Sequence, residues 1–172
     1  MTERNMLTGL FNDRESAELA YSAAAERGYD KDDINLLMSE ETRQRHFPGD
    51  ADERTELGTK AAKGTGIGGA IGGTVGAIVA AVAAVGTSVA VPGLGLVIAG
   101  PIAAALAGAG AGAATGGIIG ALVGYGIPEE RVTHYEEGIK KGGIVMGLTP
   151  RNDEDAAHLE QNWKTRGTHV FR

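Results

Sequence analysis

The organisation of this chain is decided by the stretch Gly64-Thr65-Gly66-Ile67-Gly68-Gly69-Ala70-Ile71-Gly72-Gly73-Thr74-Val75-Gly76. Glycine recurs in it at every fourth position, at Gly64, Gly68, Gly72 and Gly76. Residues four apart lie on one face of an α-helix, and glycine on that face lets another backbone approach closely. The spacing therefore predicts a helix that packs tightly along a row of glycines.

A second glycine row follows further along the chain. Its members, again four apart, are Gly108, Gly112, Gly116, Gly120 and Gly124. The segment 91–95 contains Pro92 and two glycines and should break the helix, and Pro101 suits the start of the next one. We therefore predict a helical hairpin over residues 58–126, in which the nine glycines of the two rows form the helix-packing and oligomerisation site.

The two predicted helices of this hairpin carry no charge. From Gly64 to Pro128 the sequence contains no Asp, Glu, Lys, Arg or His. A helix that is apolar all round is buried in protein or lies in lipid. Two helices of roughly 27 and 24 residues would each be about 36–40 Å long, enough to cross a hydrocarbon core of about 30 Å. We therefore expect the hairpin to insert in a membrane or to associate with one.

The charges beside the hairpin suggest its orientation. Lys60 and Lys63 lie just before its first helix and Arg131 just after its second, which favours flanks on the cytoplasmic side. An alternative remains open. Many residues of the hairpin are Ala or Gly, which suit tight helix packing, so hairpins from several copies could form the dry core of a soluble homo-oligomer or filament in the cytoplasm.

Residues 1–57 form the first flank. The pattern predicts a strand over 6–11, a helix over 13–27 capped by Asn12, and a strand over 34–38. Residues 39–57 are polar and charged and should form a mobile connector. A strand, a helix and a strand within about forty residues indicate a βαβ unit with parallel strands. The helix should turn toward the core its apolar residues Ala17, Leu19, Ala20, Ala23 and Ala24.

Residues 127–172 form the second flank. We predict a helix from Pro128 to Lys141, a strand over 144–148, a helix capped by Asn152 that runs through Lys164, and a strand over 169–171. With the middle set aside, the predicted fold class is α+β: a split ferredoxin-like βαβ–βαβ domain with the glycine-zipper hairpin inserted between its halves. Helices on one face of the sheet should bury Leu10, Leu36, Val145, Leu159 and Trp163.

The sequence offers little for catalysis or ligand binding. The net charge of -6 argues against nucleic-acid binding, and the chain has no cysteine. The match to G-x-G-x-x-G at residues 64–69 follows a charged segment instead of a strand, so it does not indicate a dinucleotide site. The four histidines lack the spacing of metal ligands. We predict no catalytic residue, cofactor, metal or small-molecule substrate. An enzyme would need a pocket that gathers His134, Tyr135 and a carboxylate.

Several short motifs resemble a known bacterial group. The first flank resembles the general-stress-protein (heat-induced stress protein) domain in Leu10-Phe11, Asp13-Arg14-Glu15-Ser16-Ala17, Gly28-Tyr29 and Asp33-Ile34. The second is similar to low-temperature-induced proteins, which join this domain to a glycine-zipper middle, in Gly126-Ile127-Pro128-Glu129-Glu130, Tyr135-Glu136-Glu137-Gly138-Ile139 and Gly142-Gly143-Ile144. The chain departs from the group at Thr133-His134 and in its highly charged connector from Glu40 to Arg54.

The resemblance implies a stress-associated bacterial protein without assigned catalytic residues. Together with the hairpin, it leads us to expect a non-enzymatic stress-response protein that self-associates through its glycine faces. Its hairpin would contact membrane lipid, and its α+β domain would face the cytoplasm. The soluble assembly described above is the alternative.

Overall fold

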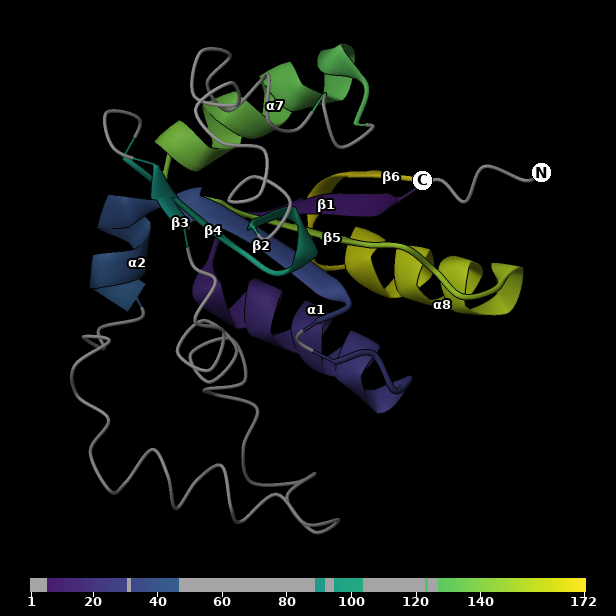
Figure 1. Cartoon of the computed structure of the whole chain (residues 1–172). Coiled ribbons are helices and arrows are strands. Elements are labelled where there is room, and N and C mark those ends of the chain that lie inside the picture. The colour runs from purple at the N-terminus through teal and green to yellow at the C-terminus, as the bar shows by residue number, and fades with distance from the viewer. Residues whose placement is uncertain (1–5, 31, 47–88, 92–94, 104–122, 124–126) are drawn as a thin grey trace, which may run out of the picture.

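The protein folds around one antiparallel sheet covered by helices on both faces (Figure 1). The computed structural model describes residues 6–30, 32–46, 89–91, 95–103, 123 and 127–172. Within these residues the sheet has six strands in the order β3-β4-β2-β5-β1-β6, and every pairing is antiparallel. The predicted α+β class is therefore confirmed.

The first flank supplies two central strands and the helix between them. These elements are β1 (Leu7–Phe11), α1 (Arg14–Glu26) and β2 (Ile34–Ser39), close to the predicted bounds. The predicted cap of α1 was wrong by one residue. Asp13, not Asn12, is the N-cap, and its Oδ1 accepts a hydrogen bond from the Ser16 amide at 2.7 Å. Both residues are good caps, and the choice depends on where the strand before the helix ends.

Part of the predicted connector is a helix. Residues Glu40–His46 form α2, directly after β2. The Ser39 hydroxyl accepts a hydrogen bond from the Thr42 amide at 3.0 Å, and Glu40 and Glu41 occupy the first turn. A serine cap and acidic residues at the N-terminus stabilise a short helix although it has no apolar stripe. The prediction of an unstructured connector was therefore wrong for this part. Residues 47–57 lie outside the described residues.

The second flank follows the prediction closely. It contains α7 (Glu129–Lys140), β5 (Ile144–Leu148), α8 (Asp153–Lys164) and β6 (Thr168–Phe171). Asn152 caps α8 as expected, because its side chain accepts from the Asp155 amide at 2.7 Å. Pro128 precedes α7 as its N-cap residue instead of opening the helix.

Two further strands come from the middle of the uncharged region. They are β3 (Val89–Val91) and β4 (Leu96–Ala99), and β4 pairs with the edge of β2. The prediction that the first helix extends through Val89 and Ala90 was wrong. Valine and isoleucine favour strands wherever a sheet edge is available to pair with them, and the sequence alone does not reveal that edge. The remainder of the predicted hairpin, apart from residues 100–103 and 123, lies outside the described residues.

The first two strands run in the same direction, as predicted, but they are not neighbours in the sheet. Both β1 and β2 pair antiparallel with β5, so they run the same way, but β5 lies between them. Leu10 pairs with Val145 on one side of β5, and Leu37 pairs with Val145 on the other. A strand that follows the uncharged region therefore joins the two strands that precede it.

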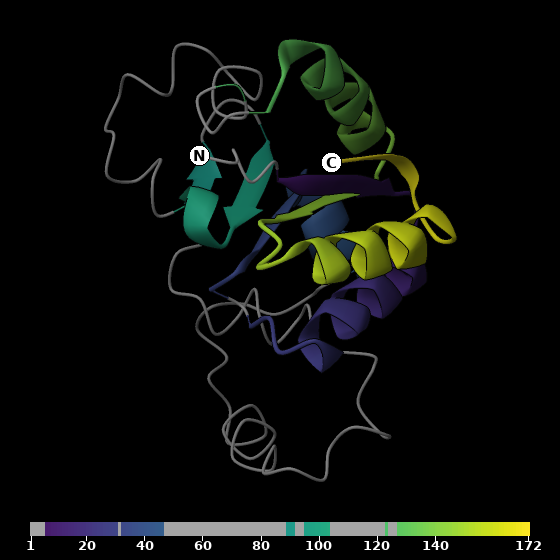
Figure 2. The ribbon, with the colours of Figure 1, turned by 90° about the vertical axis from the view of Figure 1, so that its right-hand side faces the viewer.

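The helices lie in two layers, not one. Helices α1 and α8 cover one face of the sheet, and α7 covers the other (Figure 2). All five predicted core residues are at most 4% exposed, but Leu10 and Val145 face α7, whereas Leu36, Leu159 and Trp163 face α1 and α8. The expectation of a single helical layer was wrong because α7 has its own apolar stripe, which needs a second apolar face of the sheet.

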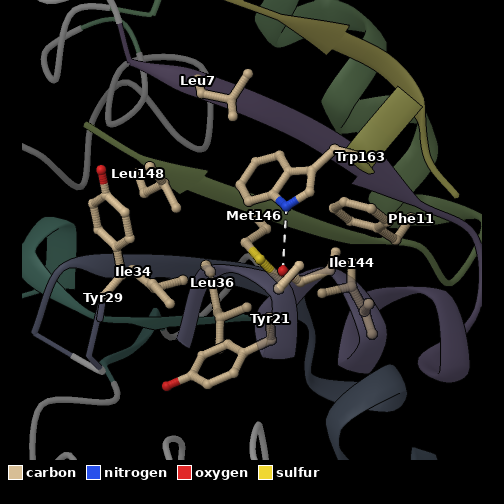
Figure 3. Close-up of a cluster of buried hydrophobic side chains, with 14 of the residues drawn as sticks. Leu7, Phe11, Tyr21, Tyr29, Ile34, Leu36, Ile144, Met146, Leu148 and Trp163 are labelled. Atoms are coloured by element: carbon tan, nitrogen blue, oxygen red, sulfur yellow. Dashed lines mark hydrogen bonds between the residues drawn. The ribbon is translucent and has the colours of Figure 1, made fainter. Parts of the chain in front are cut away.

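The larger core lies under α1 and α8 (Figure 3). Trp163 is fully buried, and its indole Nε1 donates to the carbonyl oxygen of Ala20 at 3.2 Å. Helix α1 buries its alanines as predicted, but Leu19 is 38% exposed and Tyr21 takes the expected inward position. The small alanine face allows α1 to lie close to the sheet.

Candidate functional site

The predicted helix-packing residues cannot be placed in the fold. All nine glycines of the two rows lie outside the described residues: Gly64, Gly68, Gly72, Gly76, Gly108, Gly112, Gly116, Gly120 and Gly124. The two glycine rows therefore stay a prediction. What the structure does describe is where the middle of the uncharged region attaches to the α+β domain, and this attachment is the candidate site. We call residues 89–91 and 95–103 the docked segment.

The docked segment extends the sheet beyond β2. In register, Leu36 lies opposite Ala99, Leu37 opposite Ile98 and Met38 opposite Val97. The four side chains of β4 are at most 3% exposed. Because successive residues of a strand face opposite sides, β4 contributes to both cores: Val97 and Ala99 to the one under α1 and α8, and Leu96 and Ile98 to the one under α7.

After β4 the chain turns onto the α7 side of the sheet at Gly100. This glycine has a φ of 99°, and a Cβ placed on it would overlap the main-chain oxygen of Ile34. Only glycine fits here without strain. The helical residues 101–103 follow, so Pro101 opens a helical turn as predicted.

A buried asparagine holds the start of this turn. Asn35, 2% exposed, accepts a hydrogen bond from the Ile102 amide at 2.8 Å through its Oδ1 and donates through Nδ2 to the Gly147 carbonyl at 3.3 Å. Asn35 thus caps a helical turn from a neighbouring strand. Sequence reasoning missed it, although a lone polar residue in the apolar strand Ile34-Asn35-Leu36-Leu37-Met38 was a signal that a buried partner is needed.

Both ends of the second uncharged stretch are fixed at the same place. Ile102 and Ala103, which precede residues 104–126, and Ile127, which follows them, all belong to the core between the sheet and α7. They pack there with the inward residues of α7, namely Val132, Tyr135 and Ile139. The described residues on the two sides of 104–126 therefore lie in one apolar cluster.

Replacing Gly100 with alanine should detach the docked segment. The added methyl group meets the main chain of Ile34, and alanine resists a φ of 99°. The global loss of stability should be only about 1–2 kcal/mol, because local undocking relieves the strain without unfolding the remaining strands. Hydrogen exchange should become faster at the β4 amides but not in β1. Gly95→Ala is the control, since nothing lies within 4 Å of its added Cβ although its φ is also positive.

His134 and Tyr135 do not form a shared site. Tyr135 is fully buried and hydrogen-bonds to Thr8 Oγ1 at 2.7 Å and to the His169 carbonyl oxygen at 3.1 Å. Burial raises the pKa of Tyr135 to about 12, although the Thr8 hydrogen bond and the charge of Arg131 act in the other direction. His134 points outward and stacks on His169, with ring centroids 4.8 Å apart. These two neighbouring side chains of α7 thus point in different directions, Tyr135 into the core and His134 toward solvent.

A polar cluster that the sequence did not reveal joins α1 to α8. The Asp155 carboxylate accepts from Arg27 at 2.9 Å and from the Tyr29 hydroxyl at 3.0 Å, and the Arg151 amide donates to that hydroxyl at 2.8 Å. The Arg151 guanidinium lies over the Tyr29 ring, 4.2 Å from its centroid. Burial is the main cause that raises the pKa of Tyr29. These polar groups form hydrogen bonds with one another, so the cluster has a structural role in holding α1 and α8 together.

Two kinds of feature are absent from the described part of the chain. No group of three or more His, Asp or Glu side chains there is arranged to hold a metal ion. No helix within the ranges that the structure describes is long and apolar enough to cross a membrane. In comparisons with known proteins, no family model, curated protein or solved structure matches the chain.

Proposed function

We propose that this chain is a non-catalytic stress-response protein whose uncharged region associates with the cytoplasmic membrane and with other copies of itself. One observation carries the proposal. In sequence the uncharged region lies between β2 and β5, which are paired strands of one sheet, and β5 also pairs with β1, which supports an insertion between the two halves of one domain. The domain is thus a platform that holds the middle of this region at β4 and the chain just after residue 126 at Ile127.

We also propose that the platform is a split ferredoxin-like fold. The strand order β2-β5-β1-β6 supports this, as do the antiparallel pairings and the placement of α1 and α8 on one face. The helix α7 on the opposite face and the strands β3 and β4 at the edge are then additions to that fold. Both additions flank or belong to the uncharged region, so they serve to attach it.

Charge and length support the membrane part of the proposal. The docked segment leaves two uncharged stretches on either side of it, residues 64–88 and 104–126. Each would be about 35 Å long if helical, compared with about 30 Å of hydrocarbon. Lys60 and Lys63 beside the first stretch suit an anionic cytoplasmic surface. The stress-response part rests on the motif resemblance.

Flotation on a density gradient tests the membrane proposal. We expect the full chain, mixed with vesicles of phosphatidylethanolamine and a minority of phosphatidylglycerol, to float with the lipid and to stay bound in high salt. Apolar burial does not weaken with ionic strength, whereas a purely electrostatic contact does. Protein that stays at the bottom of the gradient and elutes as a large particle without detergent would contradict membrane association.

The glycine rows should control self-association. We expect Gly72→Leu or Gly116→Leu to reduce the oligomer to smaller species, because leucine separates backbones that glycine allows to touch. Matched controls are Ala70→Leu and Ala114→Leu, which lie about 160° away on an ideal helix. Light scattering measures the mass, and the near-ultraviolet circular dichroism of Trp163 reports whether the α+β domain is intact. Equal masses for glycine and alanine variants would reject glycine-mediated packing.

A second candidate function is a soluble homo-oligomeric or filamentous assembly with the uncharged regions in its interior. One observation favours it: part of the uncharged region, Leu96–Ala99 with Ile102 and Ala103, is buried in a protein core. In this case glycine variants would change the mass of the assembly in the absence of any lipid, and the wild-type chain would fail to float.

A further inference from the structure

The docked segment and a membrane-crossing hairpin place the same residues in different locations. A hairpin that crosses a bilayer through residues 64–88 and returns through 104–126 must put its connection on the far side. That connection contains β3, β4 and Gly100, which the structure places on the sheet of the α+β domain. One copy of the segment cannot be on both sides of a bilayer at once.

The ends of residues 104–126 lead to the same conclusion. Ala103 and Ile127 are both buried in the core beneath α7, at 0% and 4% exposure. A single helix over the intervening residues would separate its ends by about 35 Å. The second stretch can therefore cross a bilayer only after Ile102 and Ala103 leave that core.

We propose that the docked segment is an autoinhibitory latch, which holds the uncharged region in its non-inserted state and must release from β2 before the hairpin crosses a membrane. This inference rests on the proposed membrane association. The latch closes through the pairing of β4 with β2, the Asn35 cap on Ile102 and the fit of Gly100 against Ile34.

The energetics suit a latch. Release exposes apolar side chains of β4 and leaves Asn35 without the Ile102 amide, so the docked state is favoured in water. Membrane crossing can offset this cost only through residues 64–88 and 104–126, which would lie in hydrocarbon, because Leu96, Val97 and Ile98 belong to the connection on the far side. The edge of β2 also loses its partner, and this unpaired edge adds to the penalty of the open state.

A disulfide can hold the latch shut. Leu37 and Ile98 lie directly opposite each other, at the spacing of about 4.5–5.5 Å between Cα atoms that a disulfide accepts. The chain has no cysteine of its own, so Leu37→Cys with Ile98→Cys gives one possible bond. Leu37→Cys with Val145→Cys is the matched control, because it joins β2 to β5 within the same core and leaves β4 free.

The experiment is flotation of each full-length variant with the vesicles described above, oxidised and reduced. We expect oxidation of the 37–98 pair to lower the floating fraction at least about fivefold and reduction to restore it, since the closed state alone is then populated. The 37–145 control should float equally in both redox states. Gly100→Ala, which weakens the latch, should raise the floating fraction or its rate of appearance at least about twofold.

The outcomes separate this inference from the proposed function. If the wild-type chain floats and the oxidised 37–98 variant floats equally, the latch is wrong and membrane association stands. If neither the wild type nor Gly100→Ala floats, membrane association fails and the latch fails with it. Should the double-cysteine variant not fold, as judged by its melting curve, the Gly100→Ala comparison decides: no increase over the wild type rejects the latch.

Discussion

Replacement of Trp163 with alanine should destabilise the domain by about 3–5 kcal/mol, the range found when a large aromatic side chain is removed from a core. Trp163 is fully buried, meets Phe11 edge to face with ring centroids 5.6 Å apart, and donates to the Ala20 carbonyl. It thus joins α8 to both β1 and α1. Urea unfolding followed by circular dichroism measures the loss.

Trp163→Phe is the informative control. Phenylalanine retains the contact with Phe11 but lacks the indole N–H, so Trp163→Phe should lower the free energy of unfolding clearly less than Trp163→Ala, while leaving the Ala20 carbonyl without this donor.

Gly9 should become tolerant of alanine in the Trp163→Ala background, because the indole is the nearest obstacle to a Cβ there, at 3.2 Å. A loss below about 1 kcal/mol for Trp163→Ala would contradict the packing described for this core.

Alkaline pH should weaken the fold through its buried tyrosines. Burial raises the pKa of Tyr135 and of Tyr21 from 10.0 to about 12. Nearby Asp30, Glu18 and Asp32 add to the effect at Tyr21. The unfolded chain releases these protons near pH 10 and the folded chain does not. The stabilisation is therefore complete below pH 10 and lost as the pH rises toward 12, by about 2–3 kcal/mol for each tyrosine.

Urea midpoints at pH 8 and pH 11 test this expectation. Tyr135→Phe should lower stability at pH 8, because the hydrogen bonds to Thr8 and His169 are lost, but its stability should fall less between the two pH values than that of the wild type. Tyr125→Phe provides a background for a tyrosine outside the described residues. A Tyr135→Phe variant with the same fall in stability as the wild type would mean that Tyr135 titrates normally in the fold.

The flanks were readable from sequence because their signals are local. The cap at Asn152, the short apolar run at 144–148 and the end of α1 before Gly28 each depend on a few neighbouring residues, and the structure has all three. Errors arose where two local signals competed. Asn12 and Asp13 are both good caps, and Leu19 and Tyr21 both suit an inward position of α1.

The candidate site was not readable in the same way. The Asn35 cap on Ile102 joins residues 67 positions apart, and β4 finds β2 across a similar distance in sequence. No local propensity encodes such a pairing. In the sequence, Asn35 is visible only as a polar residue in an apolar strand, and Gly100 only as a glycine before a proline. Neither pattern indicates which residue of the chain it will contact.

The sequence by itself determined the α+β class, the order and bounds of most flanking elements, and the uncharged region between them, because hydrophobic period, caps and charge are properties of neighbouring residues. Only the tertiary structure decided that α7 covers the second face of the sheet and that β4 pairs with the edge of β2, with β3 beyond it. An apolar run of Val, Ile, Ala and Gly is compatible with helix, strand or lipid. The choice of strand at 89–91 and 96–99 was made by a sheet edge with unpaired main-chain groups, which exists only once the rest of the domain has folded.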